Sequence, residues 1–182
     1  MTNAIKRFGI LAVCVVVSVV FLTGCSGRFG SSSTSSQEQA TTPYSEATSY
    51  VSQIKAYADT LSSKSAEFTT AVSGKDTVTI RLKLSEMTDA LQSAADLSVP
   101  DSIKDEGEKY SQACKTLKDV ISEYGNIICT AIEGGGSVND TDTLQKLSDL
   151  QTRYEEAAKS LESADSSLDT KLESLQNPTS NK

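Results

Sequence analysis

The sequence predicts an all-α fold, an antiparallel four-helix bundle that is coiled-coil-like and carried on a flexible tether. Two observations favour it. In four successive segments, apolar residues recur at alternating steps of four and three, which is the spacing of one face of a helix. Short connections separate these segments, so consecutive helices should run antiparallel. A three-helix bundle and a longer hairpin that dimerises are alternatives that the same pattern allows.

The first helix is expected to begin at Tyr44, because Pro43 closes a Ser-rich stretch, and to end near Gly74. Only Ser65 interrupts its apolar stripe, which consists of Ala47, Val51, Ile54, Ala58, Leu61, Phe68 and Val72. A stripe this regular predicts a helix that buries one face.

Two periods overlap between residues 76 and 97. An alternating set has the period of a strand: Val78, Ile80, Leu82 and Leu84. A second set has the period of a helix: Ile80, Leu84, Met87, Leu91 and Ala94. We predict a helix, because no second strand is available and an isolated strand leaves its backbone groups unpaired. Asp76 or Thr77 is the expected cap.

The third helix is expected to open at residues 98–101, where Ser98 and Asp101 have the spacing of a capping box around Pro100. Its stripe consists of Tyr110, Cys114, Leu117, Ile121, Tyr124, Ile128 and Ala131. Three consecutive glycines, residues 134–136, should end this helix.

The fourth helix is expected to begin near Asp140 or Thr141 and to stop at Asn177. The 3-4 spacing persists through Leu147, Leu150, Tyr154, Ala157, Leu161, Ala164, Leu168 and Leu175, with Leu172 beside it. A stripe of this length is typical of a coiled-coil-like contact.

The first residues have a different character. Lys6 and Arg7 precede a run from Phe8 to Leu22 that carries no charge. A positive start followed by a short apolar stretch is typical of an export signal. The run is shorter than the roughly 20 residues that cross a bilayer as a helix.

The signal ends in Leu22-Thr23-Gly24-Cys25, which resembles the lipobox of bacterial lipoproteins. The resemblance implies that the Cys25 sulfur receives a diacylglycerol, that a peptidase cuts before it, and that Cys25 becomes the first residue of the mature protein. The two acyl chains would hold the protein firmly on the extracytoplasmic face of the cell membrane. An uncleaved membrane anchor, in which Cys25 has no role, is the alternative.

The chain therefore divides into four expected parts. Residues 1–24 form the signal peptide, and residues 25–43 form the lipidated cysteine and a Ser-, Thr- and Gly-rich tether. The bundle occupies residues 44–177 and a short disordered tail occupies residues 178–182. A flexible tether of this length reaches about 23 Å.

Composition argues against several classes of function. Loss of Lys6 and Arg7 with the signal peptide lowers the net charge by two, from −7 to −9. Acidic chains bind nucleic acid poorly, because phosphate neutralisation needs clustered lysine and arginine. The chain has no histidine, the commonest general base and metal ligand. We therefore expect no catalytic residue, no metal and no cofactor.

Cys114 and Cys129 remain after processing and invite a disulfide, since the protein is expected to be exported. On one continuous helix, however, they would be about 22 Å apart, whereas a disulfide needs α-carbons within about 7 Å. We predict two free thiols. Cys114 lies on the apolar stripe and should be a core residue, and Cys129, if exposed, could join two copies of the chain.

The remaining candidate residues have structural explanations beside the functional ones. Tyr110 and Tyr124 share one helix face and could line a ligand cleft, or could be core-edge tyrosines; the same holds for Tyr50 and Tyr57. The acids Asp140 and Asp142 alternate as in a calcium loop but lack its glycine and its closing glutamate, so helix capping explains them better. Paired acids such as Glu155-Glu156 and Asp105-Glu106 are expected to be a solvated face.

These observations favour a non-enzymatic surface lipoprotein. Its partners would be the membrane, through the anchor on Cys25, and another envelope protein or the cell wall. The alternative is a helical bundle that binds a small apolar ligand near Tyr110 and Tyr124.

Overall fold

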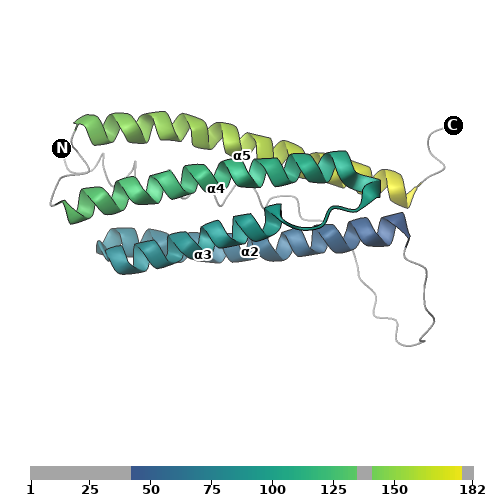
Figure 1. Ribbon diagram of the computed structural model, residues 1–182, viewed down its shortest axis with the longest axis horizontal. Helices are drawn as coiled ribbons and strands as arrows, with labels where there is room; N and C mark the ends of the chain where they lie inside the picture. Colours follow the sequence, from purple (N-terminus) through teal and green to yellow (C-terminus); the bar gives the residue numbers. More distant parts are fainter. Residues whose placement is uncertain (1–41, 135–140, 178–182) are drawn as a thin grey trace.

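The computed structural model describes residues 42–134 and 141–177, which form four long helices and one short 3-10 helix (Figure 1). They are α2 (Pro43–Gly74), α3 (Thr77–Ala95), η1 (Asp101–Ile103), α4 (Lys104–Glu133) and α5 (Thr141–Gln176). This part of the chain contains no strand. The predicted all-α, antiparallel four-helix bundle is thus confirmed.

The helices pack in chain order. Helix α2 packs on α3, α3 on α4 and α4 on α5, and α5 returns to α2 through a sparser contact that closes the bundle. The start of α2, η1 and the end of α5 share one end, which we call the near end (Figure 1). The α2–α3 turn, the end of α4 and the start of α5 share the other, which we call the far end.

Helix α2 starts one residue earlier than predicted. Thr42 is its N-cap, and the backbone N–H and side chain of Ser45 complete a capping box with it. Pro43 is the first helical residue, a position where its missing N–H costs nothing. The helix ends at Gly74, and Lys75 follows in the left-handed region with φ of 56°.

Helix α3 resolves the two overlapping periods in favour of a helix. Val78 and Leu82 are 78% and 54% exposed, whereas Ile80 and Leu84 are buried, so the four residues do not share a face. Asp76 is the cap, because its carboxylate accepts hydrogen bonds from the Thr79 N–H at 3.1 Å and the Thr79 hydroxyl at 2.6 Å.

The predicted capping box of Ser98 and Asp101 was wrong. The 3-10 helix η1 intervenes before α4, and neither has a side-chain cap. Two tertiary contacts explain the difference. Ile103, at the end of η1, is fully buried in the core, and a Cβ at Gly107 would lie 2.3 Å from a methyl carbon of Val99. The connection is therefore held by packing against α4 rather than by a cap.

One core cluster runs through all four helices. Alanine, leucine and isoleucine dominate it, and Tyr50, Phe68 and Tyr110 are the buried aromatic residues. On α5, the buried positions are Leu150, Ala157, Leu161, Ala164 and Leu168, as the predicted stripe required. Ser65, which interrupts the stripe of α2, is fully buried.

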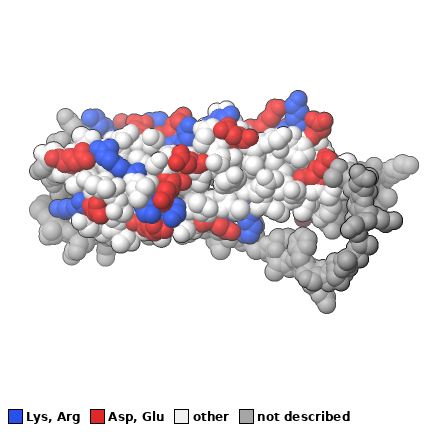
Figure 2. All heavy atoms as spheres, turned by 60° about the horizontal axis from the view of Figure 1, so that its bottom comes forward, with Lys and Arg blue, Asp and Glu red and all other residues white. Residues whose placement is uncertain are grey.

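Charge is unevenly distributed over the surface. On the face in Figure 2, the charged side chains gather toward the far end, and a wide uncharged region lies toward the near end. The sequence of α2 explains this, since from Pro43 to Ser63 only Glu46, Lys55 and Asp59 carry charge.

Candidate functional site

Tyr110 and Tyr124 both lie on α4 but do not form one site. At 1.5 Å per residue, the 14 residues between them span about 21 Å. Tyr110 is 4% exposed and lies toward the near end, whereas Tyr124 is half-buried and its ring centroid is 6.1 Å from that of Phe68 on α2. The two tyrosines belong to separate layers of the core.

The near-end layer brings together Tyr50 of α2, Tyr110 and Cys114 of α4, and Asp165 of α5. Burial raises the pKa of Tyr110 far above its usual value, and Cys114, Asp165 and Tyr50 add to the effect. Burial likewise raises the pKa of Tyr50 to about 12, with a smaller contribution from Cys114. These hydroxyls are therefore neutral at physiological pH and can only exchange hydrogen bonds.

Cys114 is a core residue, as predicted, with 1% of its surface exposed. Burial raises its pKa to about 12, against a smaller lowering from its hydrogen bond with Tyr110. A thiol in this state is a poor nucleophile, because the thiolate is the reactive species.

Cys114 and Cys129 are both free, which confirms the prediction of two unpaired thiols on one helix. Cys129 could join two copies of the chain only if it were exposed, and it is 0% exposed, so the structure excludes that role. Its helix packs against both α3 and α5, so the buried face of α4 is wider than one stripe and includes Ala113, Val120 and Cys129.

A second layer lies toward the far end and contains unpaired hydroxyls. Within the described residues, the Ser65 hydroxyl of α2 and the Tyr154 hydroxyl of α5 are buried and have no hydrogen-bond partner. The Tyr50 hydroxyl of the near-end layer shares this state. Burial also raises the pKa of Tyr154 well above its usual range. The sequence indicates Ser65 as an interruption of an apolar stripe, but nothing in it singles out Tyr154 from the other core-stripe residues.

An open surface cleft of about 400 Å³ lies at the near end. Its lining is polar apart from Tyr50 and Pro100, and consists of Ser45, Glu46, Ser49, Tyr50, Gln53, Ser98 and Pro100. Tyr50 is 2% exposed, so no aromatic face is offered to a ligand there.

Several predicted residues lie outside the part of the chain that the structure describes, and others form no site. The four lipobox residues, Leu22 to Cys25, and the side chains of Asp140 and Asp142 are not described. Glu155 and Glu156 are exposed, as expected of a solvated face. Within residues 42–134 and 141–177, no three acidic or cysteine side chains cluster closely enough to hold a metal ion.

Comparisons of the chain with protein-family models, with curated proteins and with solved structures find no match. Among the helices described, none combines the length and the apolar character that crossing a bilayer requires.

Proposed function

We propose that the chain is a lipid-anchored protein on the extracytoplasmic face of a bacterial membrane, where its bundle docks another envelope protein or the cell wall without catalysing a reaction. The observation that carries the proposal is Leu22-Thr23-Gly24-Cys25, a lipobox-like tetrapeptide at the end of an uncharged run. A Ser-rich stretch then leads to the first helix at Pro43.

The arrangement of the helices supports an anchor at the near end of the bundle. Helix α2, the first described helix, begins at the near end, where the Ser102 hydroxyl donates a hydrogen bond to the Pro43 carbonyl at 3.3 Å. Helix α2 has 32 residues and is therefore about 48 Å long. In an anchored bundle, the far end would lie farther from the membrane than the near end, by up to this length.

The far end also carries the exposed apolar side chains. Among the described residues, the large hydrophobic side chains with the greatest exposure are Val78, Leu82 and Leu144, at 78%, 54% and 48%. Val78 and Leu82 lie in the first two turns of α3, and Leu144 lies in the first turn of α5. Because all three side chains lie at the far end, we infer that the docking surface is there.

Two experiments test the proposal. Intact-mass analysis of protein from membranes should show a diacylglyceryl group on Cys25, and Cys25→Ser should release the protein from the membrane fraction. An unmodified Cys25 would contradict the anchor.

A photo-crosslinking residue at Leu82 should capture an envelope component in living cells. The control is the same residue at Ser52, an exposed position of α2 toward the near end. Equal capture at both positions, or none at Leu82, would contradict docking through the far end.

A further inference from the structure

The interface between α2 and α5 is unlike the other three. Arg81 and Glu133 join α3 to α4, Arg153 and Glu123 join α5 to α4, and Lys83 and Glu67 join α3 to α2. In the described part of the chain, no hydrogen bond or ion pair joins α2 to α5, and their packing contact is the sparsest. Separating α2 from α5 therefore breaks fewer interactions than separating any other neighbouring pair.

The same two helices carry every buried side-chain hydroxyl that lacks a partner within residues 42–134 and 141–177. They are Tyr50 and Ser65 on α2 and Tyr154 on α5. A buried polar group without a hydrogen bond costs free energy and calls for a specific explanation, such as a bound molecule.

Ser65 does not use the usual local alternative. Six other hydroxyls of α2 donate to the carbonyl four residues earlier: Thr48, Ser52, Thr60, Thr69, Thr70 and Ser73. The Ser65 hydroxyl makes no such bond, and the residue is 0% exposed. Its hydroxyl therefore lies in the core without a bond to its own helix.

Contacts with α4 place Ser65 and Tyr154 at about the same level. Arg153, the residue before Tyr154, pairs with Glu123 of α4 at 2.6 Å. Tyr124, the next residue of α4, packs against Phe68, which lies three residues after Ser65 on α2. Because Glu123 and Tyr124 are adjacent, these two contacts put Ser65 and Tyr154 within about one helical turn of the same level. Both residues occupy the core stripes of their helices, and both hydroxyls are buried without a hydrogen-bond partner.

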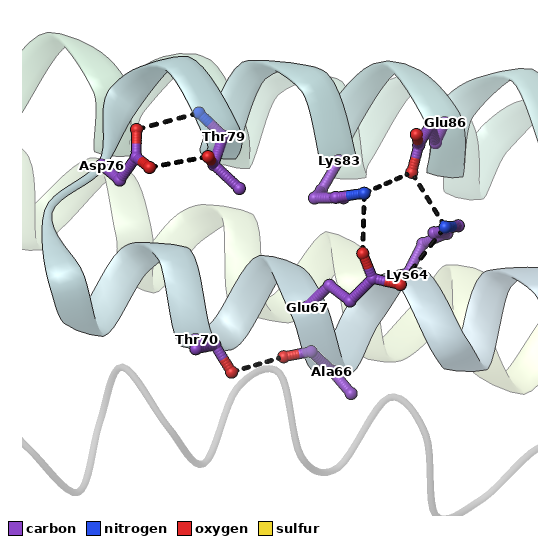
Figure 3. A network of polar contacts seen from close by, with 8 residues as sticks. All are labelled: Lys64, Ala66, Glu67, Thr70, Asp76, Thr79, Lys83 and Glu86. Atoms are coloured by element: carbon purple, nitrogen blue, oxygen red, sulfur yellow. Dashed lines mark hydrogen bonds and ion pairs between the residues drawn. The ribbon is translucent and has the colours of Figure 1, made fainter.

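Aromatic rings surround this layer. Phe68 lies one turn after Ser65 on α2, and its ring packs against Tyr124 of α4 at a centroid distance of 6.1 Å. The nearest cation on α2, Lys64, is paired with Glu67 and with Glu86 of α3 (Figure 3). Arg153, beside Tyr154, is likewise paired, with Glu123 of α4 at 2.6 Å. The cations next in sequence to Ser65 and Tyr154 are thus both engaged, which favours a neutral ligand over a charged one.

We propose that α2 and α5 separate locally to admit a neutral aromatic molecule that carries one hydroxyl or carbonyl oxygen, which hydrogen-bonds to Ser65 and Tyr154. The ring of the ligand packs against Phe68 and Tyr124. The site includes Tyr124 but not Tyr110, which is about 21 Å away along α4. This inference does not depend on the lipid anchor or on docking at the far end.

The test compares 4-fluorobenzyl alcohol with 4-fluorotoluene, which differ only in the hydroxyl group. The full chain, purified in detergent with labelled tyrosine rings, is titrated with each compound, and the ring resonances of Tyr124 and Tyr154 are followed by NMR. The alcohol should bind about fivefold more tightly than the toluene, which is the value of one net hydrogen bond. The partition of each compound into the detergent is measured without protein, so that the two are compared at equal free concentrations.

Ser65→Ala should remove most of the preference for the alcohol, and Ser63→Ala, at an exposed position of the same helix, should retain it. Tyr154→Phe, followed through Tyr124, should behave as Ser65→Ala does. Equal binding of both compounds by the unmodified chain would overturn the proposal, as would shifts confined to Tyr110 or no shift at all.

Discussion

Helix α2 contacts two neighbours in different ways. Toward α3, four charged side chains form a continuous network at distances of 2.6–3.3 Å: Lys64, Glu67, Lys83 and Glu86 (Figure 3). Toward α5, the described residues form no hydrogen bond or ion pair, and the core carries hydroxyls without partners. One helix therefore belongs to a closely joined interface and to a loosely joined one.

Chain connectivity accounts for part of this difference. Helices α2 and α3 are joined by a two-residue turn, whereas α2 and α5 are the first and last helices described. The sequence adds to it, because the ion-pairing residues of α2 lie on its α3 side. A bundle built this way is expected to open first between α2 and α5. Opening there exposes the least core surface and breaks no ion pair of the described residues.

The largest expected effect concerns the close contact of α3 with α4. A Cβ at Gly125 would lie 2.4 Å from one methyl carbon of Leu84 and 3.0 Å from its Cγ. Because Leu84 is buried, Gly125→Ala should cost about 1–3 kcal/mol in overpacking, reduced by roughly 1 kcal/mol of helix propensity. Urea unfolding followed by circular dichroism measures the loss.

Gly74→Ala is the matched control, because a Cβ there meets nothing within 4 Å. It should leave stability unchanged or raise it by up to about 1 kcal/mol. Combining Gly125→Ala with Leu84→Ala should cost less than the sum of the single changes. Additive costs would contradict the close contact.

A smaller effect separates the Tyr110 hydroxyl, which lies near the Cys114 thiol, from the unpaired Tyr154 hydroxyl. Tyr110→Phe removes a hydroxyl that interacts with Cys114 and should destabilise the protein by about 1 kcal/mol. In ligand-free protein, Tyr154→Phe removes a buried hydroxyl without a described partner and should stabilise it by a similar amount, about 1 kcal/mol. The unfolding temperatures of the two variants test this prediction. If both temperatures shift in the same direction, the two hydroxyls do not differ in the way proposed.

Hydrophobic periodicity was sufficient to predict the four helices, because each buries one stripe against the same core. It gave α3 correctly although Val78 and Leu82 fit a strand equally well. The capping motif misled at residues 98–101, where the chain is held by the burial of Ile103 rather than by a local cap. Periodicity describes one helix at a time and contains no information about such contacts.

The candidate site was less predictable for the same reason. Tyr110 and Tyr124 share a face, but a shared face says nothing about the distance along the axis that separates them. The sequence left the exposure of Cys129 open, because α4 is covered by two neighbours and buries more than one stripe. Ser65 was visible as an interruption, yet its relation to Tyr154 depends on how α2 and α5 are aligned, which the sequence of neither helix specifies.

The smallest effect is a pH dependence that should differ in sign between the two interfaces of α2. Hydrogen bonds from Lys83, and secondarily from Lys64, lower the pKa of Glu67 below its usual 4.5. The stabilisation by this pair is therefore complete above pH 4.5 and is lost as the pH falls through the lowered pKa. Glu67→Gln should reduce stability at pH 7 and have less effect at lower pH.

Asp165, which faces Lys55 near the α2–α5 interface, should behave in the opposite way. Burial raises its pKa above the usual 3.8, Asp169 adds to the shift, and Lys55 opposes it. The folded protein therefore binds this proton more tightly than the unfolded chain, so the ionised form lowers stability at pH 7 and protonation relieves the cost as the pH falls.

Asp165→Asn should raise the urea midpoint at pH 7 and lose this advantage toward pH 3.8. Added salt should diminish the Glu67→Gln difference more than the Asp165→Asn difference, because Glu67 is 43% exposed and acts through ion pairs that salt screens, whereas the pKa shift of Asp165 comes first from its partial burial. Parallel pH trends in the two variants would show that the two interfaces of α2 are electrostatically alike.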